Sequence, residues 1–296
     1  MAKEKKTKYV VVGSGKLAVK IAEYLVSKGL HPYVYEKRIA SVSSVEKSCK
    51  RLEIPYFCMN ASEMTAQFMK DLSAFQVRVF RSINTYIFPK QVIEHPNFWG
   101  MNYHNALLPY HKGMNAEAWS IYEMDDVTGI TWHRIRPAID EGEILIQKTI
   151  PLDEHINSLK LLKKQSDLAY EAFLEIAPKL FSEGADWRGT RQPEMKSASM
   201  HKIKDVPNNG YLSKKWDFQK TSAFLRAMDY GKLNTLQKPH IRFHSDVYEW
   251  ERYQLKEGTK AEQDSVELNS NEIVISKKGS TNRIILVNIQ RSEQPV

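Results

Sequence analysis

The sequence predicts an α/β protein with a Rossmann-like, largely parallel sheet and a smaller C-terminal, β-rich, barrel-like subdomain. Three observations support this fold class. Strand and helix patterns alternate through the first 150 residues, as in twisted parallel sheets covered by helices on both faces. A glycine turn, "GSGK", joins the first strand to the first helix. After Pro151 the alternation stops, and one long helix precedes a series of short strand patterns.

The first half of the chain supplies the elements of the predicted sheet. The first helix ends at Gly29, Asn60 or Ser62 is the expected N-cap of another helix, and Pro89 fits the first turn of a third. Strands are predicted at residues 7–15, 31–36, 77–83, 98–106, 128–135 and 143–150. Helices are predicted at residues 16–29, 43–54, 61–72, 89–95 and 114–124.

Three regions follow from these patterns. A first domain covers residues 1–185 and includes a long helix at 157–184, bent near Pro178. Residues 186–215 are polar and contain Gly and Pro, which is typical of a linker. Residues 216–296 combine one helix with short strands and turns, and they form the predicted β-rich subdomain.

Composition and charge exclude several classes of protein. No apolar run approaches 18 residues, so no transmembrane helix is expected. The basic start runs into a strand without the apolar core of a signal peptide, and two cysteines, Cys49 and Cys58, form neither a disulfide framework nor a metal motif. These features predict a cytoplasmic protein without a membrane partner. The net charge of +8 favours an acidic partner, although the positive residues are scattered. The oligomeric state stays open.

The glycine turn raises the possibility of dinucleotide binding. Gly13, Gly15 and Ala18 fit the pattern G-x-G-x-x-A after a strand, and Glu36 follows at a distance where an acid could bind a ribose hydroxyl. An NAD-dependent oxidoreductase is therefore one alternative. The competing interpretation is that any doubly wound domain needs small residues at its first turn for helix–sheet packing.

A second pattern lies in "GMNYHNALLPYHKGMNAEAW", residues 100–119. In a strand, Asn102 and His104 point to the same side, and the carboxyl end of a parallel strand opens on the ligand-binding edge of such sheets. An amide and an imidazole there can stabilise an oxyanion and move a proton. Asp140 lies in a loop between two strands that can return to this edge, where a carboxylate would favour the protonated imidazole.

"MNYHNALLPYHKG", followed by "TGITWH" and "IDEGEIL", resembles the signature of the 10-formyltetrahydrofolate-dependent formyltransferases. The elements of that signature are Asn-x-His, Leu-Leu-Pro, a glycine four residues after the proline, and Asp-x-Gly. The chain matches them in order with Asn102 and His104, 107–109, Gly113, and Asp140 with Gly142. The resemblance covers residues 8–185 well and the C-terminal part more loosely. It implies a formyltransferase catalytic domain at 1–185 and a Rossmann-like sheet that holds no dinucleotide.

The resemblance also implies roles for these residues. Asn102 would stabilise the tetrahedral oxyanion, His104 would transfer a proton, and Asp140 would raise the pKa of His104 and hold it in place. The co-substrate would be 10-formyltetrahydrofolate, and no metal is expected, because His111 and His133 lack a metal-ligand spacing. A degenerate homologue that only binds partners is a weaker alternative, since the chain keeps all three residues.

The resemblance places the folate pocket between two loops. One loop supplies Tyr86, Ile87 and Phe88, and Met114 would line the formyl site. The other loop precedes and includes the catalytic carboxylate, and its residues are Arg136, Pro137, Ala138, Ile139 and Asp140. Core packing is an equal alternative for Ile87 and Phe88.

The acceptor is predicted to be a primary amine of a biosynthetic intermediate. The chain is most similar to the formylation domains of peptide synthetases, which act on carrier-bound aminoacyl groups, and nucleotide-linked amino sugars are the alternative. It lacks the basic insertion typical of tRNA-specific members, so a nucleic-acid partner is not expected. Lys112, Asn115 and Trp119 are candidates for binding the acceptor, although Trp119 also suits helix packing.

Overall fold

The chain folds into two compact units. The computed structural model describes residues 6–38, 43–83, 86–183, 186–194, 199–233 and 235–292. The first unit comprises residues 1–114, 129–150 and 163–200. The second unit comprises residues 115–128, 151–162 and 201–296. Segments that are distant in the sequence therefore contribute to each unit.

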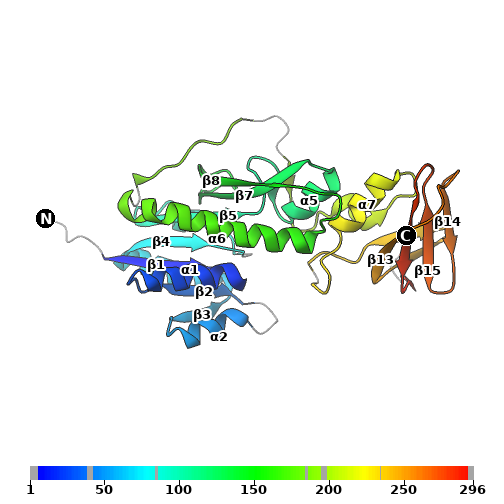
Figure 1. The fold of residues 1–296 in the computed structure, drawn as a ribbon. Coiled ribbons are helices and arrows are strands. Elements are labelled where there is room, and N and C mark those ends of the chain that lie inside the picture. The colour runs from blue at the N-terminus through cyan, green and yellow to red at the C-terminus, as the bar shows by residue number, and fades with distance from the viewer. Residues whose placement is uncertain are drawn as a thin grey trace. The chain divides into compact units, whose positions relative to one another are not determined.

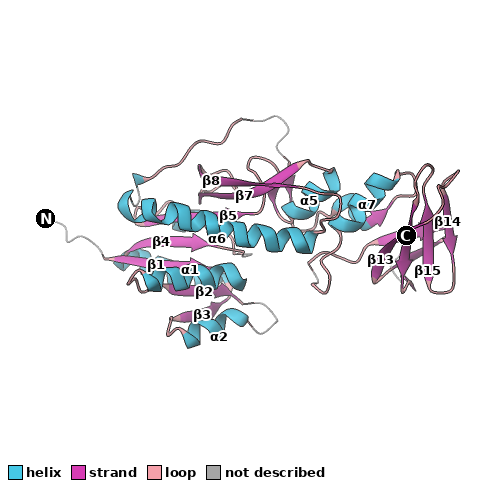
Figure 2. Cartoon of the chain, viewed as in Figure 1, coloured by secondary structure: helices cyan, strands magenta, loops and turns pink. Residues whose placement is uncertain are grey.

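The first unit contains a largely parallel sheet with helices between its strands (Figures 1 and 2). Its elements are β1 (Thr7–Val12), α1 (Gly15–Ser27), β2 (Tyr33–Lys37), α2 (Ser44–Arg51), β3 (Tyr56–Met59), α3 (Ala61–Ala74), β4 (Gln76–Arg81), α4 (Lys90–Ile93), β5 (Phe98–His104), β6 (Lys112–Gly113), most of β7 (Val127–Arg134), β8 (Ile144–Pro151) and most of α6 (Ser158–Glu183). Among the described residues the sheet order is β3-β2-β1-β4-β5-β7-β8. Strands β1 to β5 pair in parallel, and β7 pairs antiparallel with β5. The predicted fold class is confirmed.

Helices cover both faces of this sheet. One face packs against α1, α2 and α6, around buried side chains such as Leu25, Trp132 and Phe173. The other face packs against α3 and α4, around Phe68 and Val79. The central strand β1 thus presents apolar side chains in both directions, which is why its sequence ends in the buried run Val10–Val12.

Local sequence explains where individual helices begin. Helix α3 starts with a capping box: the Asn60 Oδ1 accepts from the Glu63 backbone N–H at 3.0 Å, and the Glu63 carboxylate accepts from the Asn60 N–H at 2.8 Å. This identifies Asn60, and not Ser62, as the N-cap. Helix α6 continues through Pro178, as the sequence analysis expected for one long helix.

The second unit combines helices with two small sheets. Its elements are α5 (Ala116–Glu123), the start of α6, β9 (Met200–His201) at the division between the units, the 3-10 helix η2 (Pro207–Gly210), β10 (Tyr211–Leu212), α7 (Phe218–Ala227), β11 (His240–Phe243), β12 (Asp246–Glu249), β13 (Arg252–Glu257), β14 (Ser265–Leu268), β15 (Glu272–Ser276), β16 (Asn282–Val287) and β17 (Gln290–Arg291). In the part that the structure describes, one sheet has the order β10-β11-β12-β17 and the other β13-β16-β15-β14. The predicted β-rich C-terminal region is present.

The predicted regions and the compact units divide the chain differently. Residues 115–128 and 151–162, which the sequence analysis assigned to the first domain, cluster with the C-terminal residues. The predicted boundary at residue 185 lies outside the described residues, and the predicted linker 186–215 contains β9, η2 and β10. The strand β3 was not predicted. In the described ranges, no helix is long and apolar enough to cross a membrane.

Candidate active site

Strand β5 delivers two polar side chains to the carboxyl edge of the sheet. Asn102 and His104 are buried, and they lie two residues apart on the same side of the strand. The strand register places Asn102 opposite Arg81 of β4 on one side and opposite His133 of β7 on the other. Arg81, Asn102 and His133 therefore form one row across three neighbouring strands.

Hydrogen bonds connect this row from end to end. The Arg81 Nη1 donates to the Asn102 Oδ1 at 2.9 Å, and the Asn102 Nδ2 lies 2.9 Å from the His133 Nε2. The His133 Nδ1 lies 2.9 Å from the carbonyl oxygen of Arg134, which can only accept, so the proton of a neutral His133 resides on Nδ1. Its Nε2 then accepts from the Asn102 amide.

Asp140 brings a carboxylate to the row from the loop between β7 and β8. The side chain is buried, and its Oδ1 lies 3.3 Å from the Asn102 Nδ2 and 3.3 Å from the His133 Nε2. Its Oδ2 accepts from the Gly113 backbone N–H at 2.8 Å and lies 3.4 Å from the His104 Nδ1. The three residues predicted from the sequence therefore lie together, with the Asp140 carboxylate next to both Asn102 and His104.

The loop that carries Asp140 is held by close backbone packing. Asp140 has a left-handed backbone, with φ of 54°. A Cβ at Gly142 would lie 1.8 Å from the carbonyl oxygen of Arg134, so this position requires glycine. The side-chain amide of Gln192 donates to the carbonyl oxygens of both Asp140 and Gly142 at 2.8 Å. These contacts explain the Asp-x-Gly spacing.

The "ALLP" segment after β5 is anchored through Thr131 of β7. The Thr131 hydroxyl donates to the Ala106 carbonyl at 2.7 Å and accepts from the Leu108 backbone N–H at 3.1 Å. Gln147 adds a bond from its side-chain amide to the Leu108 carbonyl at 2.9 Å. Through these bonds the chain turns back toward the site, where the His111 carbonyl oxygen lies 2.8 Å from the His104 Nε2. In a neutral His104 the proton therefore sits on Nε2.

The electrostatics of the site are set by burial and by Asp140. Burial is the largest influence on His104 and lowers its pKa below the ordinary value, although the Asp140 carboxylate opposes this effect. For Asp140, burial acts to raise the pKa, but the nearby histidines His104 and His133 and the Gly113 amide outweigh it and lower the pKa. The expectation that Asp140 raises the pKa of His104 is correct for that one interaction, but the net shift is downward.

Comparisons with known proteins identify the family. The model of the formyl transferase family, "Formyl transferase", matches residues 18–177, more than half of the chain. The chain belongs to the formyl transferase family. The resemblance inferred from the sequence is confirmed.

Individual relatives and solved structures agree with this membership. The chain is 33% identical over 134 residues to the methionyl-tRNA formyltransferase of Prochlorococcus marinus subsp. pastoris, covering 45% of this chain and 40% of the relative. It is 29% identical over 128 residues to the GDP-perosamine N-formyltransferase of Brucella melitensis, covering 43% and 47%. Thus the matched part spans less than half the length of these curated relatives.

Two solved structures share the fold along nearly the whole chain. The N-formyltransferase from Helicobacter canadensis, in complex with folinic acid and dTDP-3-aminofucose, aligns with a TM-score of 0.73 at 16% identity, covering 97% of this chain and all of that one. WlaRD, a sugar 3N-formyl transferase crystallised with dTDP and 5-N-formyl-THF, aligns with a TM-score of 0.71 at 18% identity, covering 98% and 99%.

The residues predicted to line a folate pocket differ in exposure in this formyl transferase. Tyr86 and Phe88 are buried in the core with Phe68, whereas Ile87 is 69% exposed. Contacts from Tyr86 and Phe88 to a ligand would therefore have to come from their backbone. The segment 136–139 is exposed, and Arg136 in it forms an ion pair with Glu143 at 2.8 Å.

The residues predicted to bind the acceptor belong to different units. Lys112 is half-buried in the first unit, and its ammonium lies 3.2 Å from the Glu141 carboxylate, next to Asp140. Met114, predicted to line the formyl site, is half-buried in the same unit. Asn115 and Trp119 belong to the second unit, where Asn115 is the N-cap of α5 with φ of 56°. Trp119 stacks on His201 at 3.9 Å between ring centroids, so packing within its own unit explains it.

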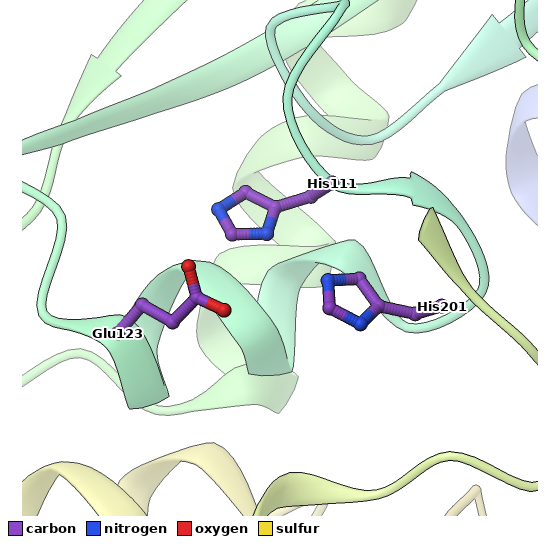
Figure 3. A group of neighbouring side chains, drawn as sticks. All are labelled: His111, Glu123 and His201. Carbon is purple, nitrogen blue, oxygen red and sulfur yellow. The ribbon is translucent and has the colours of Figure 1, made fainter. Parts of the chain in front are cut away.

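Figure 3 shows three side chains from both units: His111 from the loop before β6, Glu123 from α5 and His201 from β9. Within the first unit, the buried His111 has φ of 48°, and its Nδ1 lies 3.4 Å from the Ser199 Oγ.

His133, the second histidine considered for metal binding, uses both ring nitrogens in hydrogen bonds within the chain. Its position beside Asn102 gives it a role in the row.

The glycine turn considered for dinucleotide binding is used in packing. The Gly13 N–H donates to the Tyr35 carbonyl at 3.1 Å, and the Ser14 N–H donates to the Ile83 carbonyl at 3.0 Å. A Cβ at Gly13 would lie 2.0 Å from the Ser82 hydroxyl oxygen. The buried Glu36 accepts a hydrogen bond from the Tyr56 hydroxyl at 2.7 Å. Two backbone donors of the turn, and the acid considered for a ribose hydroxyl, therefore have partners within the protein.

Proposed function

We propose that this formyl transferase moves the formyl group of 10-formyltetrahydrofolate to the primary amine of a nucleotide-linked amino sugar. The observation that carries the proposal is the buried, mutually connected trio of Asn102, His104 and Asp140 at the carboxyl edge of the sheet. An amide donor, an imidazole and a carboxylate in contact are the groups that acyl transfer to an amine needs.

The proposed reaction proceeds by addition and elimination. The amine nitrogen attacks the formyl carbon, a carbon–nitrogen bond forms, and negative charge develops on the formyl oxygen. The Asn102 Nδ2 is the donor proposed to stabilise this oxyanion. The amine then loses a proton, the bond to the folate N10 breaks, and N10 takes up a proton as tetrahydrofolate leaves.

His104 is proposed to accept the proton of the attacking amine at one defined atom. Because Nε2 donates to the His111 carbonyl, the lone pair of the neutral ring is on Nδ1. A proton gained at Nδ1 faces the Asp140 carboxylate at 3.4 Å, which would stabilise the imidazolium. The lowered pKa keeps His104 neutral, and therefore able to act as a base, near neutral pH.

The folate is proposed to contact the exposed Ile87, the half-buried Met114 and the loop at 136–139. The backbone of Tyr86, Phe88 and Asp140 would complete the pocket. Folinic acid, 5-N-formyl-THF and tetrahydrofolate are bound in structural neighbours of this chain, which supports a folate co-substrate. Backbone groups and apolar walls suit a flat pterin ring.

The sugar acceptor replaces the aminoacyl acceptor that the sequence analysis preferred. One relative is a GDP-perosamine N-formyltransferase, and structures described with dTDP or dTDP-3-aminofucose align with at least 97% of the chain. These likenesses favour a nucleotide-linked amino sugar over a carrier-bound aminoacyl group. The matches to methionyl-tRNA formyltransferases make Met-tRNA the acceptor that any test must include.

An acceptor panel tests the proposal. The purified full chain is incubated with 10-formyltetrahydrofolate and, separately, dTDP- and GDP-linked amino sugars, aminoacyl carrier thioesters, free amino acids and Met-tRNA. Folate turnover is followed by absorbance, and products by a mass increase of one formyl group. We expect formylation of an amino sugar nucleotide. Formylation of Met-tRNA or of a carrier thioester alone would refute the proposed acceptor, and no transfer to any amine would refute the activity.

A further inference from the structure

Arg81 occupies a position in the site that the reaction chemistry alone does not require. It ends β4 in register with Asn102, and its Nη1 donates to the Asn102 Oδ1 at 2.9 Å. Burial lowers the pKa of its guanidinium, and the Asp140 carboxylate opposes that effect. A part-buried guanidinium beside a carboxamide restricts which way that carboxamide can face.

A carboxamide can flip, and a flip exchanges its oxygen with its NH2 group. Here the guanidinium can only donate, so Arg81 requires the Asn102 oxygen on its own side. The Asn102 NH2 group is thereby directed to the other side, 2.9 Å from the His133 Nε2 and 3.3 Å from the Asp140 Oδ1. A flipped amide would place its oxygen against the Asp140 carboxylate and its NH2 group against the guanidinium.

The far end of the row agrees with this orientation. The His133 Nδ1 donates to the Arg134 carbonyl at 2.9 Å, which leaves Nε2 as the acceptor for the Asn102 amide. For a neutral His133, Arg81 and the Arg134 carbonyl are therefore the two ends of a chain of hydrogen bonds that permits one amide orientation and one His133 tautomer.

We propose that Arg81 is a positioning residue that orients the Asn102 carboxamide and keeps its NH2 group, the proposed oxyanion donor, on the side of His133 and Asp140. The inference rests on the proposed function for its effect on turnover, but its effect on orientation is independent of the acceptor. Because Arg81 acts through Asn102, its contribution to catalysis must disappear when Asn102 is absent.

A double-mutant cycle tests the effect on turnover. Arg81→Met, Asn102→Ala and the double variant are compared in formyl transfer, with folate binding measured for each. Removing one oxyanion donor lowers kcat by about 10²–10³-fold. We expect Arg81→Met, which only misorients that donor, to lower kcat by at least about tenfold. Arg81→Lys, which keeps a donor, should retain more. In the Asn102→Ala background, Arg81→Met should change the rate less than about threefold, because interacting residues are non-additive.

Nuclear magnetic resonance tests the orientation itself, without any acceptor. Long-range ¹H–¹⁵N correlations of the histidine rings report which nitrogen of His133 is protonated. We expect the Nδ1–H tautomer in the unaltered protein. In Arg81→Met a flipped Asn102 would present its oxygen to Nε2 and compete with the Arg134 carbonyl for the ring proton, so we expect a change toward Nε2–H. Arg51→Met, which removes an exposed arginine paired with Glu23, is the matched control and should change neither measurement.

The two measurements separate the possible failures. Additive rate effects in the cycle, or an unchanged His133 tautomer in a folded Arg81→Met variant, would overturn the role of Arg81. If the unaltered protein formylates no amine, the proposed function fails, and the tautomer measurement still decides whether Arg81 orients Asn102.

Discussion

At the scale of single residues, the hydrogen bonds that side-chain atoms already make within the chain decide which atoms can act in the site. Asn102 and His104 were predicted from a spacing of two, because alternate residues of a strand share a face. Asp140 was predicted from its loop between two strands that can return to the same edge, and the family signature added its role. Arg81 and His133 were not predicted as site residues, because their role depends on the register between strands. That register is a long-range property, and a single sequence does not display it.

The protonation of His104 predicts the pH dependence of formyl transfer. Burial lowers the pKa of His104 below its ordinary value of about 6.5, so the neutral ring, which is the base, predominates at neutral pH. As pH falls through this lowered pKa, His104 gains a proton and kcat/KM should fall. We expect the acidic limb of the kcat/KM profile to have a midpoint below about 6.5. A midpoint above 7 would contradict the assignment of His104 as the base.

Gly142 predicts a loss of stability on a minimal substitution. In Gly142→Ala the added methyl would lie 1.8 Å from the Arg134 carbonyl oxygen, so the loop that carries Asp140 must move. We expect a lower thermal midpoint: a cost of about 1–3 kcal/mol lowers it by roughly 2–4 °C per kcal/mol in a unit of this size. Gly258→Ala, whose methyl would lie 3.6 Å from its nearest neighbour, is the control. Equal stability of the two variants would refute the close contact.

At the scale of elements, short and irregular segments were the hardest to predict. The strand β3 (YFCM) is apolar but only four residues long, too short to be distinguished in the sequence from the helix and loop beside it, and its Phe57 and Cys58 are exposed. Tyr86 and Phe88 lie in a loop, yet they pack into the core, because α3 presents Phe68 to them. A linear sequence does not show that partner. Helix α3 was predicted well, since its cap and apolar spacing are both local.

The anchoring of the "ALLP" segment predicts an effect of one hydroxyl group. Thr131→Val keeps the shape of the side chain but removes the donor to Ala106 and the acceptor for Leu108. The loss of a buried hydrogen-bond partner costs about 1–3 kcal/mol, so unfolding should begin at a lower denaturant concentration. Formyl transfer should also fall, because this segment carries the His111 carbonyl to His104. Ser48→Ala, which removes an exposed hydrogen bond within α2, is the control, and an equal effect of both changes would refute the anchoring.

At the scale of the whole molecule, the chain does not divide where its composition changes. Within the second unit, the Ser158 hydroxyl donates to the Ala227 carbonyl at 2.6 Å, and the Asn157 amide donates to the Asp229 carboxylate at 2.7 Å. The buried Glu117 of α5 accepts from the Tyr230 hydroxyl. These early segments therefore form hydrogen bonds with residues that lie 69 to 113 positions later in the chain. The alternation of elements indicated the sheet correctly but could not reveal these pairings.

This arrangement predicts the behaviour of a truncated chain. A fragment of residues 1–185 keeps α5 but lacks Tyr230, which leaves the buried Glu117 without that donor and exposes the apolar face around Ile121. We expect the fragment to be less stable than the full chain and to aggregate on heating. Circular dichroism during thermal unfolding, with the full chain in parallel, measures this. A fragment as stable as the full chain would show that the first 185 residues fold on their own.

The central claim is that Asn102, His104 and Asp140 together perform formyl transfer. The most direct measurement is turnover by His104→Ala and Asp140→Ala with the best acceptor from the panel, alongside folate binding and circular dichroism. Proton-transfer groups contribute about 10²–10⁴-fold, so both variants should lose most turnover while they remain folded and still bind folate. Near-normal turnover in both folded variants would contradict the claim.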